Sequence, residues 1–157
     1  MVNIRLATSS DIASLIHLNY EVQLLHINIA PSVFCNVQEL EVSQWFEEQI
    51  KDGNTQVYIA ENSKAVLGYL IVKVITRPSN PFMFEQRYAY IEHMCVNSES
   101  RGKGIGRLLI STAISFVKDS GIDSIELDVW SKNTNAINVY KQIGFQANKE
   151  KLIYKVE

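Results

Sequence analysis

Polar and apolar residues follow two regular spacings along the first half of the chain, and each spacing predicts an element. Residues 2–6 alternate between polar and apolar side chains, as a short half-buried strand does. Thr8 and Asp11 are placed as in a capping box, and apolar residues three and four positions apart then predict a helix over 12–27. A second helix is expected to begin at an N-cap at Asn36, because the same apolar spacing follows it.

The second half of the chain alternates β-forming and helical segments. Residues 56–61 and 65–76 flank a polar turn and predict an antiparallel hairpin, and a loop with two prolines follows over 77–86. Further along, the expected order is a strand over 88–96, a glycine-rich turn over 101–106, a helix ending before Gly121, a strand over 125–129, a helix over 133–143 and a mostly extended remainder to Val156. This order predicts the α/β class, with a mixed sheet and helices packed on it.

Length and composition indicate one globular domain over 1–157. The chain has 157 residues, of which 46% are hydrophobic and 20% charged; these values are close to globular averages and exclude a disordered or collagen-like chain. The net charge of −2 provides no bulk attraction to nucleic acid, so we expect no nucleic-acid partner. An anionic ligand therefore has to be held by a local arrangement.

The cysteines, histidines and apolar runs exclude other classes. Cys35 and Cys95 are far apart and lack a CxxC pattern, so two free thiols in a reducing compartment are expected. His17, His26 and His93 are scattered, which argues against a bound metal. No apolar run approaches the roughly 20 residues of a membrane span, and no apolar signal core begins the sequence. We therefore expect a soluble cytoplasmic protein without a membrane partner.

The segment Arg101–Gly106 carries the first candidate chemistry. Its alternating glycines leave the backbone amides uncovered, and the helix that follows adds free N–H groups and a positive dipole end. Arg101, Lys103 and Arg107 supply positive charge, so the segment can form a phosphate cradle. A Walker loop and a dinucleotide fingerprint both need a different spacing. A tight turn with solvated basic residues is the structural alternative.

Two motifs resemble those of the GCN5-related N-acetyltransferase superfamily. The acetyl-CoA fingerprint of that family is Gln or Arg, two residues, Gly, one residue, then Gly or Ala, and it is matched by Arg101, Gly104 and Gly106. The second signature, N-x-x-A-x-x-x-Y-x-x-x-G-F, is matched by Asn133, Ala136, Tyr140, Gly144 and Phe145. The two motifs lie in the family's order, and the resemblance covers about a third of the chain.

The resemblance implies a twisted, largely antiparallel sheet that is flanked by about four helices and split where the fourth and fifth strands diverge. It implies acetyl-CoA as co-substrate, held by Met94, Cys95, Val96, Arg101, Gly102, Lys103, Gly104, Ile105, Gly106, Arg107, Asn133 and Ala136. Backbone amides of the fourth strand would polarise the thioester carbonyl, and Tyr140 would protonate the departing thiolate as general acid. The structural alternatives are an N-cap for Asn133 and an ordinary surface tyrosine for Tyr140.

The general base has two candidates on the fourth strand. Alternation groups Glu92 with Tyr90 and Met94 and places His93 on the opposite face, unless a bulge intervenes. We favour Glu92, for which a carboxylate paired with a neighbouring basic residue is the structural alternative; His93 or a water molecule is the second choice. Nothing near Cys95 would lower the pKa of its thiol, so we interpret it as a packing residue and not as a covalent nucleophile.

The acceptor is expected to be a primary amine of a small molecule or peptide, bound by segments between the shared motifs. These segments are His26–Cys35 and Arg77–Arg87, the second with Phe82, Phe84 and Glu85, because aromatic rings and carboxylates suit a cationic amine. The same aromatics would equally serve as a lid or a dimer contact. A homodimer is expected only because homodimers are common in the family.

These features predict an acetyl-CoA-dependent N-acetyltransferase in which the amine attacks the thioester directly. The alternative is a catalytically silent acyl-CoA-binding module that acts as a sensor or scaffold. An unrelated nucleotide-binding domain would require ATP or NAD to compete with CoA, and the broken Walker and dinucleotide spacings disfavour it.

Overall fold

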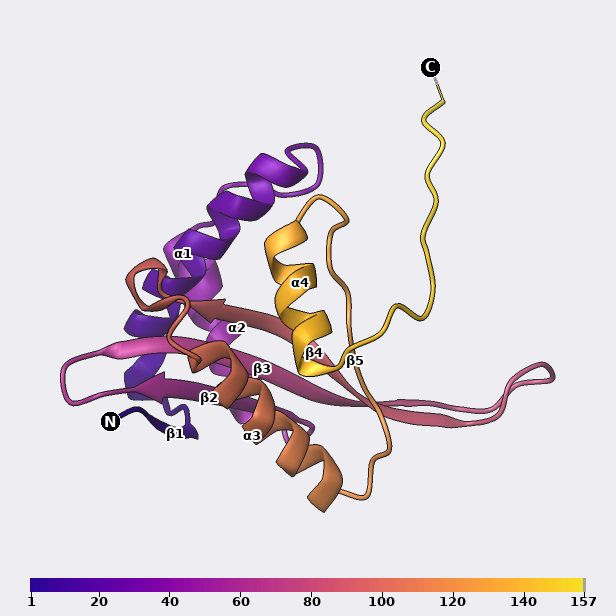
Figure 1. Cartoon of the computed structure of the whole chain (residues 1–157), viewed down its shortest axis with the longest axis horizontal. Coiled ribbons are helices and arrows are strands. Elements are labelled where there is room, and N and C mark those ends of the chain that lie inside the picture. The colour runs from indigo at the N-terminus through magenta and orange to yellow at the C-terminus, as the bar shows by residue number, and fades with distance from the viewer. Residues whose placement is uncertain (157) are drawn as a thin grey trace.

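A five-stranded sheet organises the chain, and the computed structural model describes residues 1–156 (Figure 1). The strands lie in sequence order: β1 (Asn3–Leu6), β2 (Thr55–Glu61), β3 (Val66–Arg77), β4 (Gln86–Val96) and β5 (Ile125–Leu127). The first four strands run antiparallel to their neighbours, and β5 runs parallel to β4. The sheet is therefore mixed and largely antiparallel, which confirms the predicted class.

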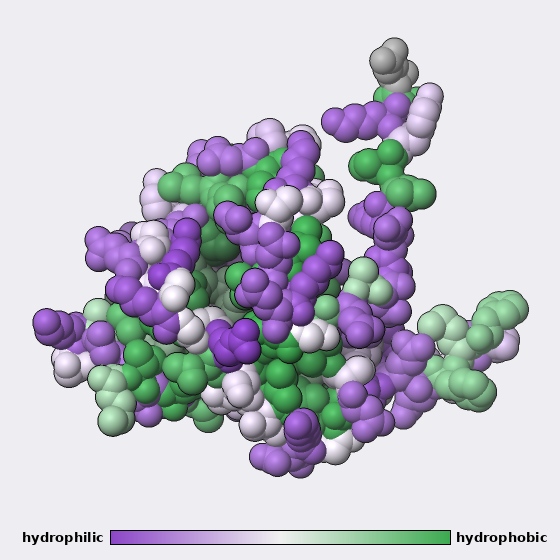
Figure 2. All heavy atoms as spheres, viewed as in Figure 1, coloured by the Kyte–Doolittle hydropathy of each residue, from purple (hydrophilic) through white to green (hydrophobic). Residues whose placement is uncertain are grey.

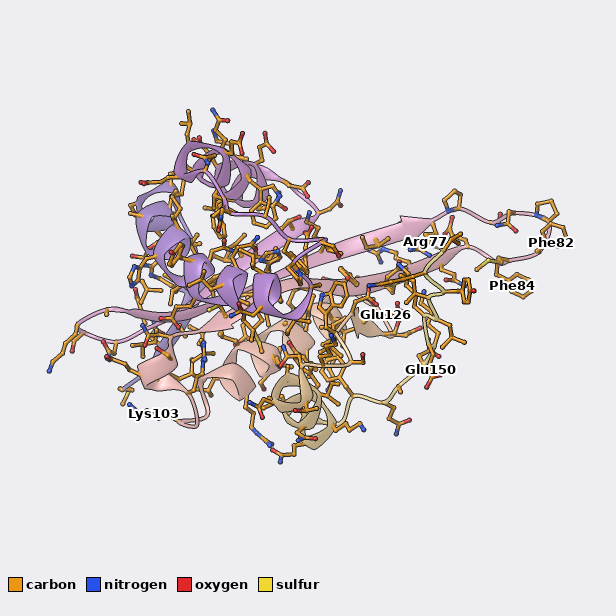
Figure 3. All side chains as sticks on the ribbon, turned by 90° about the horizontal axis from the view of Figure 1, so that it is seen from above. Arg77, Phe82, Phe84, Lys103, Glu126 and Glu150 are labelled. Carbon is orange, nitrogen blue, oxygen red and sulfur yellow. The ribbon has the colours of Figure 1, made fainter. Side chains whose placement is uncertain are left out.

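Helices cover both faces of this sheet. The helices are α1 (Ile12–Ile29) and α2 (Glu39–Lys51) on one face, and α3 (Ile105–Asp119) and α4 (Thr134–Ile143) on the other (Figure 3). Two short 3-10 turns, η1 (Ser9–Asp11) and η2 (Ser98–Ser100), lie before α1 and before α3. Within residues 1–156, none of the helices is both long and apolar enough to cross a membrane.

The middle strands are buried on both faces, because each face packs against a pair of helices. Leu70 of β3 and Ile91 of β4 belong to the core cluster on the side of α3 and α4. Ile71 of β3 and Phe46 of α2 belong to a second cluster on the opposite side. A strand that is covered twice needs apolar residues at successive positions, and this explains the apolar run within β3.

The second helix begins later than the sequence predicts. α2 starts at Glu39 with Gln38 as its N-cap residue, whereas Asn36 lies in the preceding loop. The Gln23 side-chain amide donates a hydrogen bond of 2.7 Å to the Cys35 carbonyl oxygen. This bond fastens the loop before Asn36 to α1.

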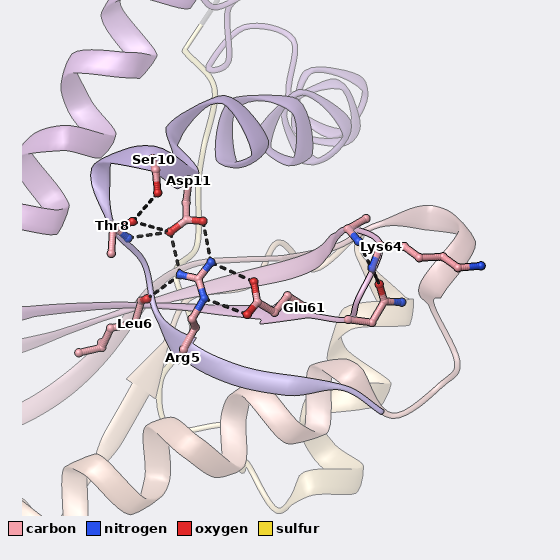
Figure 4. A network of polar contacts seen from close by, with 9 residues as sticks. Arg5, Leu6, Thr8, Ser10, Asp11, Glu61 and Lys64 are labelled. Carbon is pink, nitrogen blue, oxygen red and sulfur yellow. Dashed lines mark hydrogen bonds and ion pairs between the residues drawn. The ribbon is translucent and has the colours of Figure 1, made fainter.

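Arg5 of β1 ties the first strand both to the start of α1 and to the end of β2 (Figure 4). Its guanidinium donates two hydrogen bonds of 2.9 Å to the Asp11 carboxylate and two of 2.9 Å to the Glu61 carboxylate. The Thr8 amide donates to the Asp11 carboxylate at 2.7 Å, and the predicted capping box is present. These hydrogen bonds lower the pKa of the buried Asp11 carboxyl to about 2, and the bonds from Arg5 have the largest effect.

Asp11→Asn should destabilise the fold, because it removes one of the two carboxylate charges that pair with Arg5. Since the pKa of Asp11 falls from 3.8 to about 2 on folding, the ionised carboxylate contributes about 2 kcal/mol at neutral pH. Thermal unfolding at pH 7 should show a melting temperature lower by about 4–8 °C for a chain of this size. The difference from wild type should shrink as the pH falls through about 4 towards 2, where wild-type Asp11 also becomes protonated.

Glu47→Gln is the matched control for this variant. Glu47 and Lys51 form an ion pair of the same 2.9 Å length, but on the exposed surface of α2. Exposed pairs contribute about 0–1 kcal/mol, so Glu47→Gln should unfold close to wild type. Equal melting temperatures for wild type and Asp11→Asn at pH 7 would contradict the role given to the Arg5 network.

Candidate active site

β4 contains one residue more than its pairing with β3 requires, and this bulge lies where the sheet opens. Ile71 pairs with His93 and Val72 pairs with Ile91, which leaves Glu92 without a partner on β3. β5 pairs with only three residues of β4, and the last of them is Ile91. Within residues 1–156 no strand pairs with the outer edge of β4 beyond this point, because β5 itself ends at Leu127, the partner of Ile91.

The bulge changes which side chains share a face. Glu92 forms an ion pair with Lys73, and Tyr90 is the direct neighbour of Lys73 in the β3–β4 register. Met94 instead packs with the core cluster beneath α3. The predicted grouping of Glu92 with Met94 is therefore wrong, because one inserted residue reverses the alternation beyond it. The structural alternative for Glu92 is a carboxylate paired with a neighbouring basic residue. Lys73 is that basic residue.

His93 follows the bulge and faces α2. Its ring lies 5.1 Å from the Trp45 ring, and its Nδ1 is 3.5 Å from the Tyr69 hydroxyl oxygen, which accepts a 3.0 Å hydrogen bond from the Asn19 amide. Burial lowers the pKa of His93, so its imidazole is neutral at neutral pH. A neutral imidazole can accept a proton, and His93 therefore stays among the candidate bases.

The turn between η2 and α3 exposes backbone N–H groups. Gly102 and Gly104 have φ angles of 75° and 81°, in the left-handed region that glycine adopts without strain. Gly104 is the N-cap residue of α3, and the first bond of the helix runs from the Leu108 amide to the Gly104 carbonyl oxygen. The amides of residues 105–107 therefore have no partner within the helix, and they lie at the positive end of its dipole.

α3 packs its first turn directly on the free part of β4. A Cβ atom at Gly106 would lie 3.8 Å from a methyl group of Met94 and 3.8 Å from one of Val96. The Ile105 side chain is 2% exposed in the same core, so it serves packing. The helix N-terminus and the unpaired edge of β4 are thus neighbours, and one ligand can contact both.

The basic residues of the turn have different roles. Arg101 donates to the Val96 carbonyl oxygen at 3.0 Å and to the Glu21 carboxylate at 3.2 Å, so it fastens the turn to β4 and α1. The Arg101 side chain is 56% exposed, and its contact with a phosphate stays a prediction. Lys103 and Arg107 are exposed, and neither forms an ion pair within the described part of the chain. Figure 3 shows Lys103 on the outside of the turn.

α4 carries the second motif on the α3 side of the sheet. Asn133 is its N-cap residue, and the side-chain oxygen accepts a 3.3 Å hydrogen bond from the Ala136 amide, which confirms the capping interpretation. Tyr140 packs against the α3 core cluster, with its ring 5.7 Å from the Phe145 ring. Burial raises the pKa of Tyr140, so the phenol is protonated at neutral pH.

Three aromatic rings from separate segments meet at the end of α1. The His26 and Phe34 rings stack with centroids 4.8 Å apart, and the Trp130 ring meets Phe34 edge-on at 5.6 Å. Asp128, two residues before Trp130, accepts a 3.0 Å hydrogen bond from the Tyr90 hydroxyl. Figure 2 shows a hollow between α1 and α4. His26 and Phe34 belong to the predicted acceptor segment 26–35, and the structure brings them to this side of the opening.

Sequence reasoning misses three residues of this region: Lys73, Asp128 and Trp130. The available signal for Asp128 and Trp130 is their position directly after the last strand, where alternation places both on one face. Lys73 is a charged residue within an apolar strand. This indicates that it has a partner of opposite charge, but the sequence does not show which residue that is. Pairing across strands is needed to find that the partner is Glu92.

The second predicted acceptor segment lies away from the opening. Residues 77–87, which we call the hairpin arm, project from the sheet between β3 and β4 (Figure 3). Phe82 and Phe84 at the tip are 94% and 93% exposed. The tip of the arm therefore does not line the opening at the β4 bulge within one chain, because the continued pairing of β3 with β4 carries it outward.

Cys95 is a packing residue, as predicted. Its side chain is buried on the α1 side of the sheet, and its thiol donates to the Leu18 carbonyl oxygen at 3.2 Å. Burial raises the pKa of the Cys95 thiol to about 11, so the nucleophilic thiolate is scarce at neutral pH. Cys35 is exposed, and both cysteines are free thiols.

Comparison with protein families identifies the class to which this architecture belongs. The family model described as Acetyltransferase (GNAT) family matches residues 22–145, which include the bulge, the glycine turn and α4. The chain belongs to the GNAT acetyltransferase family.

Curated relatives align with part of their length. L-ornithine N5-acetyltransferase NATA1 of Arabidopsis thaliana is 30% identical over 103 residues, which are 64% of this chain and 43% of that protein. N-acetyltransferase 8B of Rattus norvegicus is 25% identical over 97 residues, which are 62% of this chain and 42% of that protein. The chain thus spans less than half the length of these relatives.

Solved structures share the fold over nearly the whole chain. A tetramutant of the BH1408 protein from Bacillus halodurans is 26% identical with a TM-score of 0.93, and the match covers 98% of this chain and 99% of that one. Aminoglycoside N-acetyltransferase AAC(6')-Iy in complex with CoA has a TM-score of 0.78 at 15% identity, covering 99% of this chain and 95% of that one. The second likeness concerns the fold alone.

Proposed function

We propose that residues 1–157 act as one N-acetyltransferase domain, which moves the acetyl group of acetyl-CoA to a primary amine of a small molecule or peptide. The opening at the β4 bulge is the observation that carries this proposal, because an anion-binding turn, a free strand edge and candidate acid and base groups surround it. Membership in the GNAT family and a solved neighbour in complex with CoA support acetyl-CoA as the co-substrate. A cytoplasmic location stays a prediction from the sequence.

Acetyl-CoA would bind with its phosphates at the glycine turn and its pantetheine arm along β4. The unpaired amides of residues 105–107 and the charges of Lys103 and Arg107 suit a pyrophosphate. The unpaired edge of β4 over 92–96 offers backbone groups to the pantetheine amides, as it would to an added strand. Ala136 on α4 is half-buried and small, which leaves room for a thin chain.

The proposed reaction is a direct attack within a ternary complex. Glu92, directly or through water, takes a proton from the acceptor ammonium group, and the amine nitrogen forms a bond to the thioester carbonyl carbon. The carbon–sulfur bond breaks, and Tyr140 donates its proton to the departing CoA sulfur. The attacking nitrogen loses its second proton, which restores the Tyr140 phenol through solvent. Backbone amides of Met94–Val96 would stabilise the oxyanion.

We call the part of the opening near His26, His93 and Glu92 the acceptor side, because we propose that the acceptor amine binds there. Most charges on this side cancel. Burial lowers the pKa of His26 and of His93, so both imidazoles are neutral at neutral pH. The Glu92 carboxylate is balanced by the Lys73 ammonium group. The same ion pair favours the second candidate function, a catalytically silent acyl-CoA-binding module, because the Lys73 ammonium group already contacts the carboxylate that would have to take the proton.

Asp128 leaves one negative charge on this side that is not balanced. Its carboxylate accepts the Tyr90 hydroxyl hydrogen bond and forms no ion pair within residues 1–156. The Trp130 ring lies two residues further on and is partly exposed. The acceptor is therefore expected to carry a second cation besides the reacting amine, held by Asp128 and by the face of Trp130.

Tyr140→Phe should lower kcat about 100-fold while the Kd for acetyl-CoA stays within about twofold of wild type. Calorimetry gives the Kd, and release of the CoA thiol with a panel of amines gives kcat. Tyr58→Phe is the matched control. Tyr58 belongs to the same core cluster and burial also raises its pKa, but it lies on β2, which is not a neighbour of β4 in the sheet. If the wild-type protein binds acetyl-CoA but releases no CoA thiol with any amine, the silent module is favoured. If it does not bind acetyl-CoA at millimolar concentration, both functions are rejected.

Glu92→Gln should lower kcat by about tenfold or more at neutral pH, with little change in the Kd for acetyl-CoA, if Glu92 is the base. His93→Gln is the comparison, because His93 is the next residue along β4 and also faces the α2 side. The pH dependence of kcat/KM should lose its lower limb only in the variant that lacks the base. A larger loss in His93→Gln would move this role to the imidazole.

Asp128→Asn should raise KM for a dicationic acceptor by about tenfold or more, because a hydrogen bond to a charged group contributes about 1.5–3 kcal/mol. The probes are 1,4-diaminobutane and the monoamine n-butylamine, which differ by one charged group. Wild type should prefer the diamine, and Asp128→Asn should use both amines alike. Asp123→Asn, an exposed carboxylate before β5, is the control, and an unchanged preference in Asp128→Asn would remove Asp128 from acceptor binding.

A further inference from the structure

Lys73 is the single charged residue in the stretch 66–76 of β3. Alternation along β3 places it on the same face as Ile71, which belongs to the core cluster beneath α1 and α2. Its Nζ atom lies 2.5 Å from the Glu92 Oε2 atom, and the two side chains are 24% and 30% exposed. Within residues 1–156 this oxygen atom has no other hydrogen-bond or ion-pair partner. An ammonium group is thus held in a half-buried place against one carboxylate.

The other groups around Lys73 leave its charge to Glu92. Lys73 pairs with Thr55 of β2 on one side and with Tyr90 of β4 on the other. The Asp52 carboxylate, before β2, accepts a hydrogen bond from the Thr55 hydroxyl and forms no ion pair within the described part of the chain. A buried ion pair contributes little net stability, because the loss of hydration offsets the attraction between the charges. Fold stability therefore gives little reason for a lysine at this position.

Lys73 lies where an acceptor amine would have to bind. A lysine side chain is itself a primary amine, and an acceptor must bring its ammonium group to Glu92 in the same way. Tyr90, beside Lys73, donates its hydroxyl hydrogen bond to Asp128, the expected second contact of an acceptor. Burial lowers the pKa of His93, and the nearby Lys73 charge acts in the same direction. Lys73 thus stands on the acceptor side, in contact with the candidate base.

We propose that Lys73 is the first acceptor of this domain, and that its Nζ atom takes an acetyl group from acetyl-CoA bound along β4 of the same chain. This rests on the proposed function, because it uses the same cofactor site, base and acid. A group that is held in place within one molecule reacts as if it were at a very high concentration, so Lys73 has an advantage over a free amine. The acetylated side chain is an amide and does not react again, so each chain takes up one acetyl group at this position.

The step is the proposed acetyl transfer with an internal amine. Glu92 takes one proton from the Lys73 ammonium group and later releases it to solvent. The flexible four-carbon stem of the lysine turns the neutral nitrogen towards the thioester carbonyl carbon, and a carbon–nitrogen bond forms. The carbon–sulfur bond breaks, and Tyr140 protonates the departing CoA sulfur. The nitrogen loses a second proton, which restores the Tyr140 phenol through solvent, so the products are the Lys73 amide, the CoA thiol and one proton.

Acetylation of Lys73 changes the charge of the acceptor side. The amide carries no charge, so the Glu92 carboxylate loses the ammonium group that balances it. Glu92 and Asp128 then give this side two unbalanced negative charges, which attract a cationic acceptor more strongly. The modification therefore converts a chain whose base is occupied into one whose base is open to an external amine.

The first test incubates the full chain with acetyl-CoA in a buffer that contains no amine. Peptide mass spectrometry before the reaction gives the fraction of chains already acetylated on Lys73, and each of the others should release one CoA thiol and gain an acetyl group on Lys73. Lys51 is the control within the same sample, because it also pairs with a glutamate, at 2.9 Å, but on the exposed surface of α2. Equal acetylation of Lys51 and Lys73 would show nonspecific chemical acetylation and would overturn the proposal.

Variants of the acid and the base separate catalysed from chemical acetylation. Tyr140→Phe should slow the acetylation of Lys73 about 100-fold and Glu92→Gln about tenfold or more, whereas the acetylation of Lys51 should keep its rate. At constant acetyl-CoA, the rate per chain should not change when the protein is diluted, because the transfer occurs within one chain. An unchanged rate in both variants, or a rate that falls on dilution, contradicts transfer to Lys73 within its own active site.

Two variants at Lys73 test the release of Glu92. Lys73→Gln resembles the acetylated side chain, whereas Lys73→Arg keeps the positive charge and cannot be acetylated in this way. With n-butylamine as acceptor, kcat/KM of Lys73→Gln should exceed that of Lys73→Arg by about tenfold or more, while both keep the circular dichroism of wild type. Equal kcat/KM values would reject the release of Glu92 by acetylation.

The same assays distinguish failure of this proposal from failure of the proposed function. If wild type releases CoA thiol with n-butylamine while Lys73 stays unmodified, self-acetylation is rejected and the N-acetyltransferase function stands. If wild type releases no thiol with or without an amine, and Lys73 stays unmodified, both are rejected.

Discussion

A single inserted residue in β4 sets the geometry on which the rest of the site depends. Glu92 has no partner on β3, and the pairing of β5 with β4 ends at the residue before it. Because backbone groups beyond that point face no strand, an extended ligand can use them. The same insertion turns Met94 towards α3 and leaves Glu92 with Lys73 on the other face. One local irregularity therefore creates both the free edge and the separation of the candidate base from the cofactor side.

The charges around this opening are divided between its two sides. The N-terminus of α3, with Lys103 and Arg107, provides an uncompensated positive region suited to phosphates. Beyond β5, Asp128 provides a negative charge beside Trp130. Arg101 stands in the same turn as Lys103, and it donates from Nε to a main-chain carbonyl oxygen and from one Nη to Glu21. An anionic cofactor and a cationic acceptor would thus be attracted to different ends of one opening.

Burial acts on the titratable groups of the site in opposite directions, and each direction suits its group. It raises the pKa of the Tyr140 phenol, which keeps the proton that the proposed general acid has to donate. It raises the pKa of the Cys95 thiol, which suppresses a competing nucleophile. It lowers the pKa of His26 and of His93, which keeps positive charge off the acceptor side. All four effects follow from the cost of placing a charge in a medium of low polarity.

The sequence by itself determined the element order, the class of the sheet, the glycine turn and the cap at Asn133, because these depend on periodicity and on residues within one or two turns of each other. The tertiary structure alone decided what depends on one residue of register or on distant partners. Alternation cannot locate an inserted Glu92, and no local rule pairs Arg101 with Glu21, eighty positions earlier. The place of the hairpin arm was likewise decided by strand pairing, since only the register of β3 with β4 fixes how far the arm extends.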